Sequence, residues 1–181
     1  MSRLWSVVGE DFDRYRMMMV FLMTMPRIPQ LYTGDEILMT SATRERDDAS
    51  YRRDFPGGWA GDRIDAFTGK GLTAHQRAAQ ELVRKLANWR KGQSVIHHGK
   101  LMHYGPRDNT YVYFRYDGDK KVLVAFNNNP KEMVLDTHRF REMLAGVPGG
   151  VDVLSGKRFE LGKELRLPAK ASVILELEAA R

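Results

Sequence analysis

Apolar residues recur at helical spacing along residues 10–25. Phe12, Tyr15, Met19 and Met23 share one face of a helix drawn through this segment. A second apolar side is formed by Met17, Met18 and Leu22. A helix that is apolar over so much of its circumference is expected to be buried on more than one side. The pattern therefore predicts a buried helix over residues 10–25, ended by the proline that follows.

A second helical pattern covers residues 73–91. Its apolar stripe consists of Ala79, Leu82, Val83, Leu86 and Trp89. Thr73 and Gln76 have the spacing of a capping box, and Gly92 follows the last periodic residue as a C-terminal cap. These signals predict a helix with defined ends.

After Gly92 the apolar pattern changes to a period of two, which is typical of half-buried strands. Strands are expected at Val95–His98, Lys100–Tyr104, Tyr111–Tyr116, Val122–Phe126, Glu132–Leu135, Gly150–Leu154 and Ser172–Leu177. The Asp-Gly-Asp turn after Tyr116 predicts a hairpin, and Phe159–Leu167 is expected to add a hairpin arm around Gly162. Short strands at this spacing indicate an antiparallel β-sandwich.

Between the two helical segments lie a short apolar run and a long polar loop. Residues 28–33 are bracketed by proline and glycine, as expected of a strand buried on both faces in a parallel sheet. Gly34, Asp35 and Glu36 follow it, at the end of a strand where barrels of parallel strands carry their active sites. Residues 40–71 are rich in Arg, Asp and Gly, but they also contain aromatic residues, which argues against simple disorder.

Composition excludes several classes of protein. The net charge is +6, but the basic residues are spread along the chain and interleaved with acidic ones, so a solvated mixed-charge surface is favoured over nucleic-acid binding. The chain has no cysteine, which excludes disulfides and thiolate metal sites. The longest apolar run, Met17–Met25, is far short of the roughly 20 residues of a membrane span, and no secretory signal is visible.

Two motifs carry a resemblance to a known family. Residues 28–37 read Ile-Pro-Gln-Leu-Tyr-Thr-Gly-Asp-Glu-Ile, and residues 52–59 read Arg-Arg-Asp-Phe-Pro-Gly-Gly-Trp. With the helix and strands that follow, they resemble the C-terminal part of an α-amylase superfamily enzyme of glycoside hydrolase family 13. The resemblance is strongest to the cyclomaltodextrinases and neopullulanases of starch-using Bacteroidetes, and it covers essentially the whole chain.

The resemblance implies a mixed fold. Residues 1–92 would form the last β/α units of a (β/α)8 TIM barrel, and residues 93–181 a Greek-key β-sandwich. The intact enzyme would be a retaining hydrolase of α-1,4-glucosidic bonds in maltooligosaccharides or cyclodextrins, periplasmic, with no cofactor except a possible calcium ion in the part that precedes this chain. The start of the chain resembles the sequence just after the Asn-His-Asp triplet of such enzymes. We therefore expect no catalytic residue here and no activity from the chain alone.

The resemblance also suggests where the chain would touch a sugar. Asp48 and Arg52 resemble an Asp/Arg pair that holds sugar hydroxyls in family members, with Asp47 as an alternative to Asp48. Trp59, Phe55 and Tyr51 are candidates to stack on sugar faces. The competing interpretation is a surface salt bridge for the Asp/Arg pair and packing beneath the loop for Trp59.

Other polar residues are expected to be structural. Asp35 and Glu36 are neighbours on one strand end, so their side chains would point to opposite faces, and they are expected to bind backbone amides. The histidines His97, His98 and His103 lack a convergent carboxylate, so no metal site is predicted.

Two alternatives from other classes stay open. The chain could be a carbohydrate-binding or interaction module without catalysis, or a basic protein that binds nucleic acid, which the interspersed charges disfavour. A strand and two helices from a barrel also leave faces without neighbours. We therefore expect residues 1–40 to self-associate, to contact the rest of a barrel, or to pack in a different way.

Overall fold

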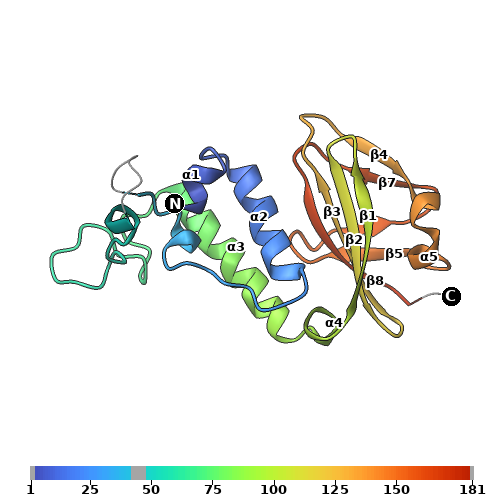
Figure 1. The fold of residues 1–181 in the computed structure, drawn as a ribbon, viewed down its shortest axis with the longest axis horizontal. Helices are drawn as coiled ribbons and strands as arrows, with labels where there is room; N and C mark the ends of the chain where they lie inside the picture. Colours follow the sequence, from blue (N-terminus) through green and yellow to red (C-terminus); the bar gives the residue numbers. More distant parts are fainter. Residues whose placement is uncertain (1–2, 42–47, 180–181) are drawn as a thin grey trace. The chain divides into compact units, whose positions relative to one another are not determined.

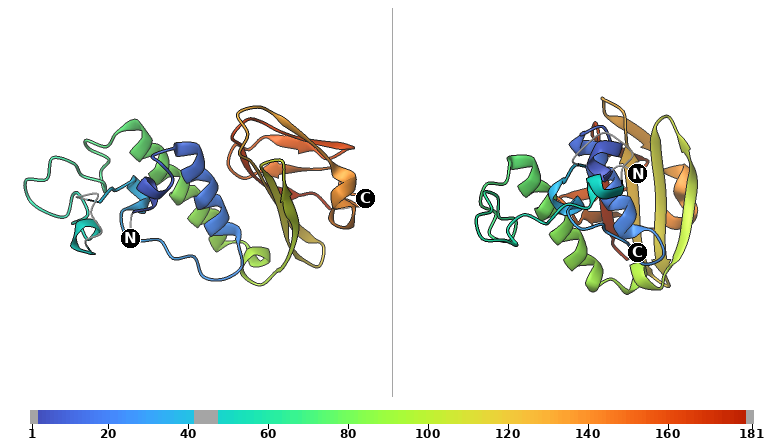
Figure 2. Two further views of the ribbon diagram at one scale, coloured as in Figure 1. Left: turned by 45° about the horizontal axis from the view of Figure 1, so that its top comes forward. Right: turned by 60° about the vertical axis from the view of Figure 1, so that its left-hand side comes forward.

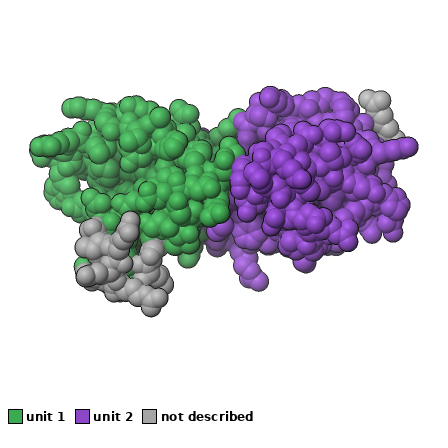
Figure 3. Space-filling model, turned by 90° about the horizontal axis from the view of Figure 1, so that it is seen from above, with its two compact units in different colours: residues 1–16, 29–85 green, residues 17–28, 86–181 purple. Residues whose placement is uncertain are grey.

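The computed structural model describes residues 3–41 and 48–179. Contacts divide the chain into two compact units, which Figure 3 shows in different colours. Unit 1 contains Met1–Arg16 and Pro29–Lys85, and unit 2 contains Met17–Ile28 and Leu86–Arg181. The predicted domains, residues 1–92 and 93–181, stay a prediction.

Three of the described α-helices lie within residues 3–91 (Figures 1 and 2). They are α1 (Leu4–Val7), α2 (Phe12–Thr24) and α3 (Ala74–Lys91), so both predicted long helices are confirmed. The predicted capping box is also present: the amide of Thr73 donates to Gln76 Oε1 at 2.9 Å, and the amide of Gln76 donates to Thr73 Oγ1 at 3.2 Å.

Unit 1 also contains two short 3₁₀ helices, η1 (Asp35–Ile37) and η2 (Asp48–Tyr51). Its small core joins Ile37 and Met39 to Ala66 and Leu72, with Phe55 packed against them. This core connects the segment after η1 to the second half of the long loop. The second half of the loop therefore contributes to the core of unit 1.

The prediction of a buried strand at residues 28–33 is wrong. This segment is not assigned to any strand, Ile28 is 89% exposed, and Tyr32 is 48% exposed. A parallel strand requires neighbours that supply hydrogen bonds on both sides. Every strand pairing in the part of the chain that the structure describes is antiparallel, so no parallel barrel strand is seen there.

Unit 2 contains an antiparallel β-domain, as predicted (Figure 1). Its strands are β1 (Lys100–Arg107), β2 (Thr110–Asp117), β3 (Lys120–Asn127), β4 (Met133–Asp136), β5 (Gly149–Asp152), β6 (Arg158–Glu160), β7 (Glu164–Leu167) and β8 (Ser172–Leu177). Six of them form a sheet in the order β1-β2-β3-β8-β5-β6, and β4 pairs with β7. The predicted hairpin is β2–β3, closed by the pair Asp117 and Lys120. The Greek-key description stays a prediction.

Two local predictions in this unit are wrong. The segment Val95–His98 is not a strand. Its first three residues lie in α4 (Ser94–His97), and the amides of His97, His98 and Gly99 donate back to the carbonyls of Gln93, Ser94 and Val95. Phe159–Leu167 does not form a hairpin: β6 pairs with β5 and β7 pairs with β4, so the segment crosses between the two sheets. Short apolar runs do not distinguish a helical turn from a strand, nor one partner strand from another.

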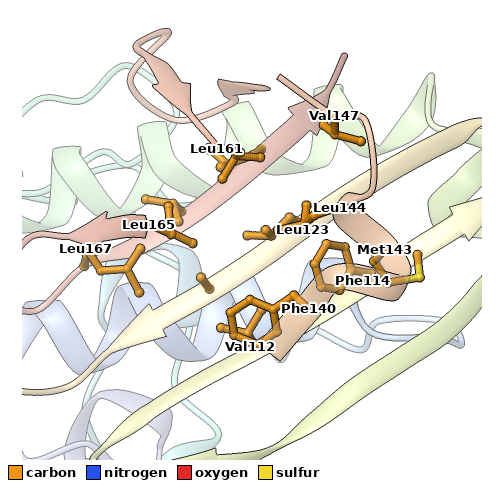
Figure 4. Close-up of a cluster of buried hydrophobic side chains, with 14 residues drawn as sticks. Val112, Phe114, Leu123, Phe140, Met143, Leu144, Val147, Leu161, Leu165 and Leu167 are labelled. Carbon is orange, nitrogen blue, oxygen red and sulfur yellow. The ribbon is translucent and has the colours of Figure 1, made fainter. Parts of the chain in front are cut away.

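The main core lies on one face of the six-stranded sheet (Figure 4). Val112, Phe114 and Leu123 project from β2 and β3 into it. The opposing side chains come from β7 and from a layer formed by η3 (Thr137–Phe140) and α5 (Arg141–Leu144). Phe140 is 1% exposed, and its ring meets those of Tyr104 and Phe114 at centroid distances of 4.8 and 6.3 Å. This aromatic cluster joins the covering layer to the sheet.

The C-terminal half of α2 packs on the other face of β2. Tyr113 is fully buried, and its hydroxyl forms a hydrogen bond with Thr24 Oγ1. Arg115, 1% exposed, donates to the carbonyls of Thr24 and Gly99, each at 2.8 Å. Positive charge is favoured at a helix C-terminus, where carbonyls lack partners within the helix. These bonds attach the end of α2 to the sheet.

Candidate functional site

The candidate site is the second half of the long loop in unit 1. The turn at residues 56–59 of this loop is held by the carboxylate of Asp62. Asp62 Oδ2 accepts hydrogen bonds from the amides of Gly57 at 2.7 Å and Trp59 at 3.2 Å. Gly57 has φ = 99°, a conformation that favours glycine, and a Cβ there would lie 2.4 Å from Asp65 Oδ1. The Pro-Gly-Gly-Trp turn is therefore fixed by backbone geometry and by one carboxylate.

A second turn follows immediately. Asp65 Oδ1 accepts from the amides of Phe67 at 2.9 Å and Thr68 at 3.2 Å, and the amide of Asp65 donates to the Lys70 carbonyl at 2.9 Å. The hydrogen bonds from Thr68, first from its side chain, lower the pKa of Asp65. Gln80 on α3 donates to the Ala66 carbonyl at 2.8 Å, so this turn is also tied to a helix.

Three aromatic side chains in the second half of the loop differ in exposure. Phe55 is partly buried and packs against the small core of unit 1. Its ring meets that of Phe67 at 5.3 Å. Trp59 is 68% exposed and Phe67 is 75% exposed. Packing beneath the loop therefore describes Phe55 but not Trp59, whose indole is available to a ligand.

The predicted Asp/Arg pair lies at η2. Asp48 is the first residue of this helix, and Arg52 follows its last residue with an exposed side chain. The amide of Arg52 donates to the carbonyl of Ala49 at 3.2 Å. Asp47 lies outside the described residues, as does the side chain of Asp48. The structure therefore places Arg52 on the surface and leaves its pairing with either aspartate as a prediction.

Asp35 and Glu36 make structural contacts. Glu36 Oε2 accepts from the amide of Gly34 at 2.7 Å, which confirms the expected backbone role for this residue. Asp35 lies 3.9 Å from Arg3 Nη1, and its carbonyl accepts from the hydroxyl of Tyr15 at 3.0 Å. Burial raises the pKa of Asp35, and the positive charge of Arg3 opposes that shift. Burial also raises the pKa of Tyr15.

Part of unit 2 matches a known protein family. Residues 101–176 match the family model of the cyclo-malto-dextrinase C-terminal domain. This chain resembles the C-terminal part of an α-amylase-family enzyme.

Solved structures support the same fold. An α-amylase from Geobacillus thermoleovorans, complexed with acarbose, is 18% identical with a TM-score of 0.73, covering 98% of this chain and 36% of its own. AmyP with maltotriose is 18% identical with a TM-score of 0.71, covering 94% and 35%. The cyclic α-maltosyl-(1→6)-maltose hydrolase of Arthrobacter globiformis is 17% identical with a TM-score of 0.70, covering 98% and 33%. The chain thus spans about a third of the length of these structures.

Two residues that organise the loop of this amylase-like chain, Arg3 and Asp62, were not predicted from the sequence. Arg3 and Asp62 organise the loop, yet neither belongs to a motif that names its partner. The spacing of Asp62 shortly after Gly-Gly-Trp is the usable signal, because aspartate carboxylates commonly accept from turn amides nearby. Arg3 carried no such signal, since its partners are 30 and 48 positions away.

The described residues contain neither a metal cluster nor a spanning helix. Within them, no group of three or more His, Cys, Asp or Glu side chains is placed to hold a metal ion. His97 and His98 contact each other, with ring centroids 5.9 Å apart, and His103 contacts Tyr111. None of the described helices of the amylase-like chain has the length and hydropathy needed to cross a membrane.

Proposed function

We propose that this chain is the C-terminal part of a retaining hydrolase of α-1,4-glucosidic bonds in starch-derived maltooligosaccharides or cyclodextrins. In this proposal, residues 40–71 form one wall of the glucan-binding site, with Asp48, Arg52, Trp59 and alternatively Asp47 as contacts. The observation that carries it is the exposed indole of Trp59, held on a fixed turn, in a chain that also contains a domain of the cyclo-malto-dextrinase type.

The position of Trp59 suits a stacking role. An indole offers a large apolar face with few rotatable bonds, so little conformational entropy is lost when a ligand covers it. The hydrogen bonds from Gly57 and Trp59 to Asp62 fix the turn before a ligand arrives. Two of the similar structures hold oligosaccharide-type ligands, maltotriose in AmyP and acarbose in the Geobacillus α-amylase, which supports a glucan as the ligand here.

An Asp/Arg pair has the right chemistry to complete the site. A carboxylate accepts hydrogen bonds from sugar hydroxyls, while a guanidinium donates to their oxygens in a fixed planar geometry. The exposed position of Arg52 at the end of η2 is compatible with this role.

Hydrolysis itself is not expected from the chain alone. A retaining glycosidase needs two carboxyl groups about 5–5.5 Å apart, one acting as nucleophile and one as acid/base. The neighbouring acids at η1 do not meet this need, because Glu36 binds a backbone amide and Asp35 lies beside Arg3. We expect no release of reducing sugar from maltoheptaose or β-cyclodextrin; clear turnover by the purified chain would contradict the proposal.

A second candidate function is a carbohydrate-binding module that acts without catalysis. The same exposed Trp59 favours it. The two candidates differ in whether a preceding segment with the catalytic carboxylates belongs to the natural protein. Sequencing the DNA upstream of the Met1 codon separates them: an in-frame Asn-His-Asp supports the hydrolase, and a stop codon with a ribosome-binding site supports the module.

The binding experiment is a calorimetric titration of the chain with maltoheptaose. We expect a Kd of about 1 mM, binding lost in Trp59→Ala, and binding largely kept in Trp59→Phe, which retains an aromatic face. Phe67→Ala is the matched control, because Phe67 is an equally exposed aromatic of the same loop. Equal affinity in the wild type and Trp59→Ala would contradict the assignment of Trp59.

A further inference from the structure

Arg3 makes contacts that connect three separate segments of unit 1. Its side chain is buried, with the whole residue 4% exposed. One guanidinium nitrogen, Nη1, donates to the carbonyl of Thr33 and lies 3.9 Å from Asp35 Oδ1. The other, Nη2, donates to the carbonyl of Tyr51 at 2.6 Å. The guanidinium also lies over the ring of Tyr32, 4.5 Å from its centroid.

The two carbonyls belong to the segments on either side of residues 42–47. Thr33 directly precedes the turn into η1, and Tyr51 is the last residue of η2, immediately before Arg52. A single 3₁₀ turn has little stability of its own, so the position of η2 depends on contacts made by its ends. The bond from Arg3 to Tyr51 is such a contact, and it lies one residue from the predicted sugar ligand.

The geometry uses a property that arginine has and lysine lacks. A guanidinium is a rigid planar fork whose separate N–H groups can bind two acceptors at once, whereas an ammonium group is a compact point charge. The carbonyls of Thr33 and Tyr51 take separate nitrogens of this fork. Neither carbonyl needs a positive charge as such, so the bridging geometry is what distinguishes arginine at this position.

We propose that Arg3 is a positioning residue for the glucan-binding loop: it fixes η2 against the segment at Thr33 and thereby sets the position of Arg52. This inference rests on the proposed function. It adds that affinity for the glucan depends on a buried side chain that does not itself contact the ligand. Arg3 would act through the loop backbone, in contrast to Trp59 and Arg52, which would touch the sugar.

Two variants of Arg3 and one matched control test the proposal. Arg3→Lys keeps the charge but loses the bridge, and Arg3→Met keeps an unbranched stem without donors. Arg115→Met is the control, because Arg115 is also buried and also donates to backbone carbonyls, but those of unit 2. All are measured at a temperature at which circular dichroism shows each variant to be folded.

The first readout is amide hydrogen exchange, which requires no ligand. We expect both Arg3 variants to accelerate exchange at the Arg52 amide, which bonds to Ala49, while exchange in α3 stays as in the wild type. Arg115→Met is expected to leave the Arg52 amide unchanged. If exchange at this amide does not change in either Arg3 variant, the positioning role is overturned.

The second readout is affinity for maltoheptaose. We expect Arg3→Lys to weaken binding about tenfold, because a bridging charged hydrogen bond is lost, and Arg115→Met to leave it unchanged. Equal weakening by Arg115→Met would overturn the inference, since general destabilisation would then explain both. If the wild type binds no glucan but the Arg3 variants still loosen the Arg52 amide, the proposed function fails while the positioning of the loop stands.

Discussion

Replacing Arg115 with methionine tests how the end of α2 is attached to the β-domain. Arg115 is buried, and its guanidinium donates to three backbone carbonyls: those of Thr24 and Gly99 at 2.8 Å and that of Lys100 at 3.4 Å. Burial lowers the pKa of this guanidinium, because the charged form loses solvation there. The bonds therefore have to offset a desolvation cost.

The expected loss of stability follows from the two hydrogen bonds of 2.8 Å, to the carbonyls of Thr24 and Gly99. Hydrogen bonds from a charged donor contribute roughly 1.5–3 kcal/mol each, and a buried acceptor left without a partner costs about 1–3 kcal/mol. Removing the cation recovers part of its desolvation cost, which is several kcal/mol for a buried ion. Because the Thr24 carbonyl stays buried without this donor, we expect Arg115→Met to lower the free energy of unfolding of unit 2 by about 3 kcal/mol.

The assay is urea unfolding followed by circular dichroism of the β-sheet. Arg166→Met is the matched control: Arg166 is 62% exposed and pairs with Glu132 and Glu164 at the surface, so its loss is expected to cost less than about 1 kcal/mol. A change of less than about 0.5 kcal/mol in Arg115→Met, or a gain in stability, would refute the reasoning, because the desolvation cost would then outweigh the bonds.

Two further predictions concern the β-domain. Phe140→Ala removes a ring that is 1% exposed and packed against Tyr104 and Phe114, so we expect it to lower the free energy of unfolding by about 3–5 kcal/mol. The control Val134→Ala changes a side chain that is 43% exposed, and we expect it to lower the free energy of unfolding by less than about 1 kcal/mol. Similar urea midpoints for the two variants would contradict this prediction. Burial and the hydrogen bond to Glu142 raise the pKa of Tyr104 from 10.0 to about 12. As pH rises, Tyr104 loses its proton in the unfolded chain before it does so in the folded protein, so its contribution to stability is complete below about pH 10 and is lost between about pH 10 and pH 12. We therefore expect the melting temperature of Tyr104→Phe to fall less than that of the wild type from about pH 9 to pH 11. An equal fall in both proteins would contradict the raised pKa of Tyr104.

Sequence reasoning succeeded where several local signals agreed. The apolar stripe, the Thr73–Gln76 capping box and the following glycine all indicated α3, and all three refer to residues within one helix. The β2–β3 hairpin was found for the same reason, since its turn and its alternating strands are adjacent in the chain. Such features depend on contacts between residues that are close in the chain, so a single sequence is enough to predict them.

Prediction from the sequence failed where the structure of a segment depends on partners that are distant along the chain. Residues 28–33 have the composition of a buried strand, but the described residues supply no parallel neighbour to pair with them. β6 and β7 are close in sequence, yet each pairs with a different strand elsewhere. The buried position of Arg3 was equally unpredictable, because its partners lie in segments that only the folded chain brings together.

The central claim is that the loop of unit 1 binds an α-glucan through Trp59. The most direct measurement is nuclear magnetic resonance of the indole N–H groups during a maltoheptaose titration. The chain has three tryptophans, and the two others are internal controls: Trp5 is buried, and the Trp89 indole donates to Glu176 at 2.7 Å. The account predicts that the Trp59 signal shifts and saturates while the other two stay in place. No shift of the Trp59 signal at about ten times the expected millimolar Kd would contradict it.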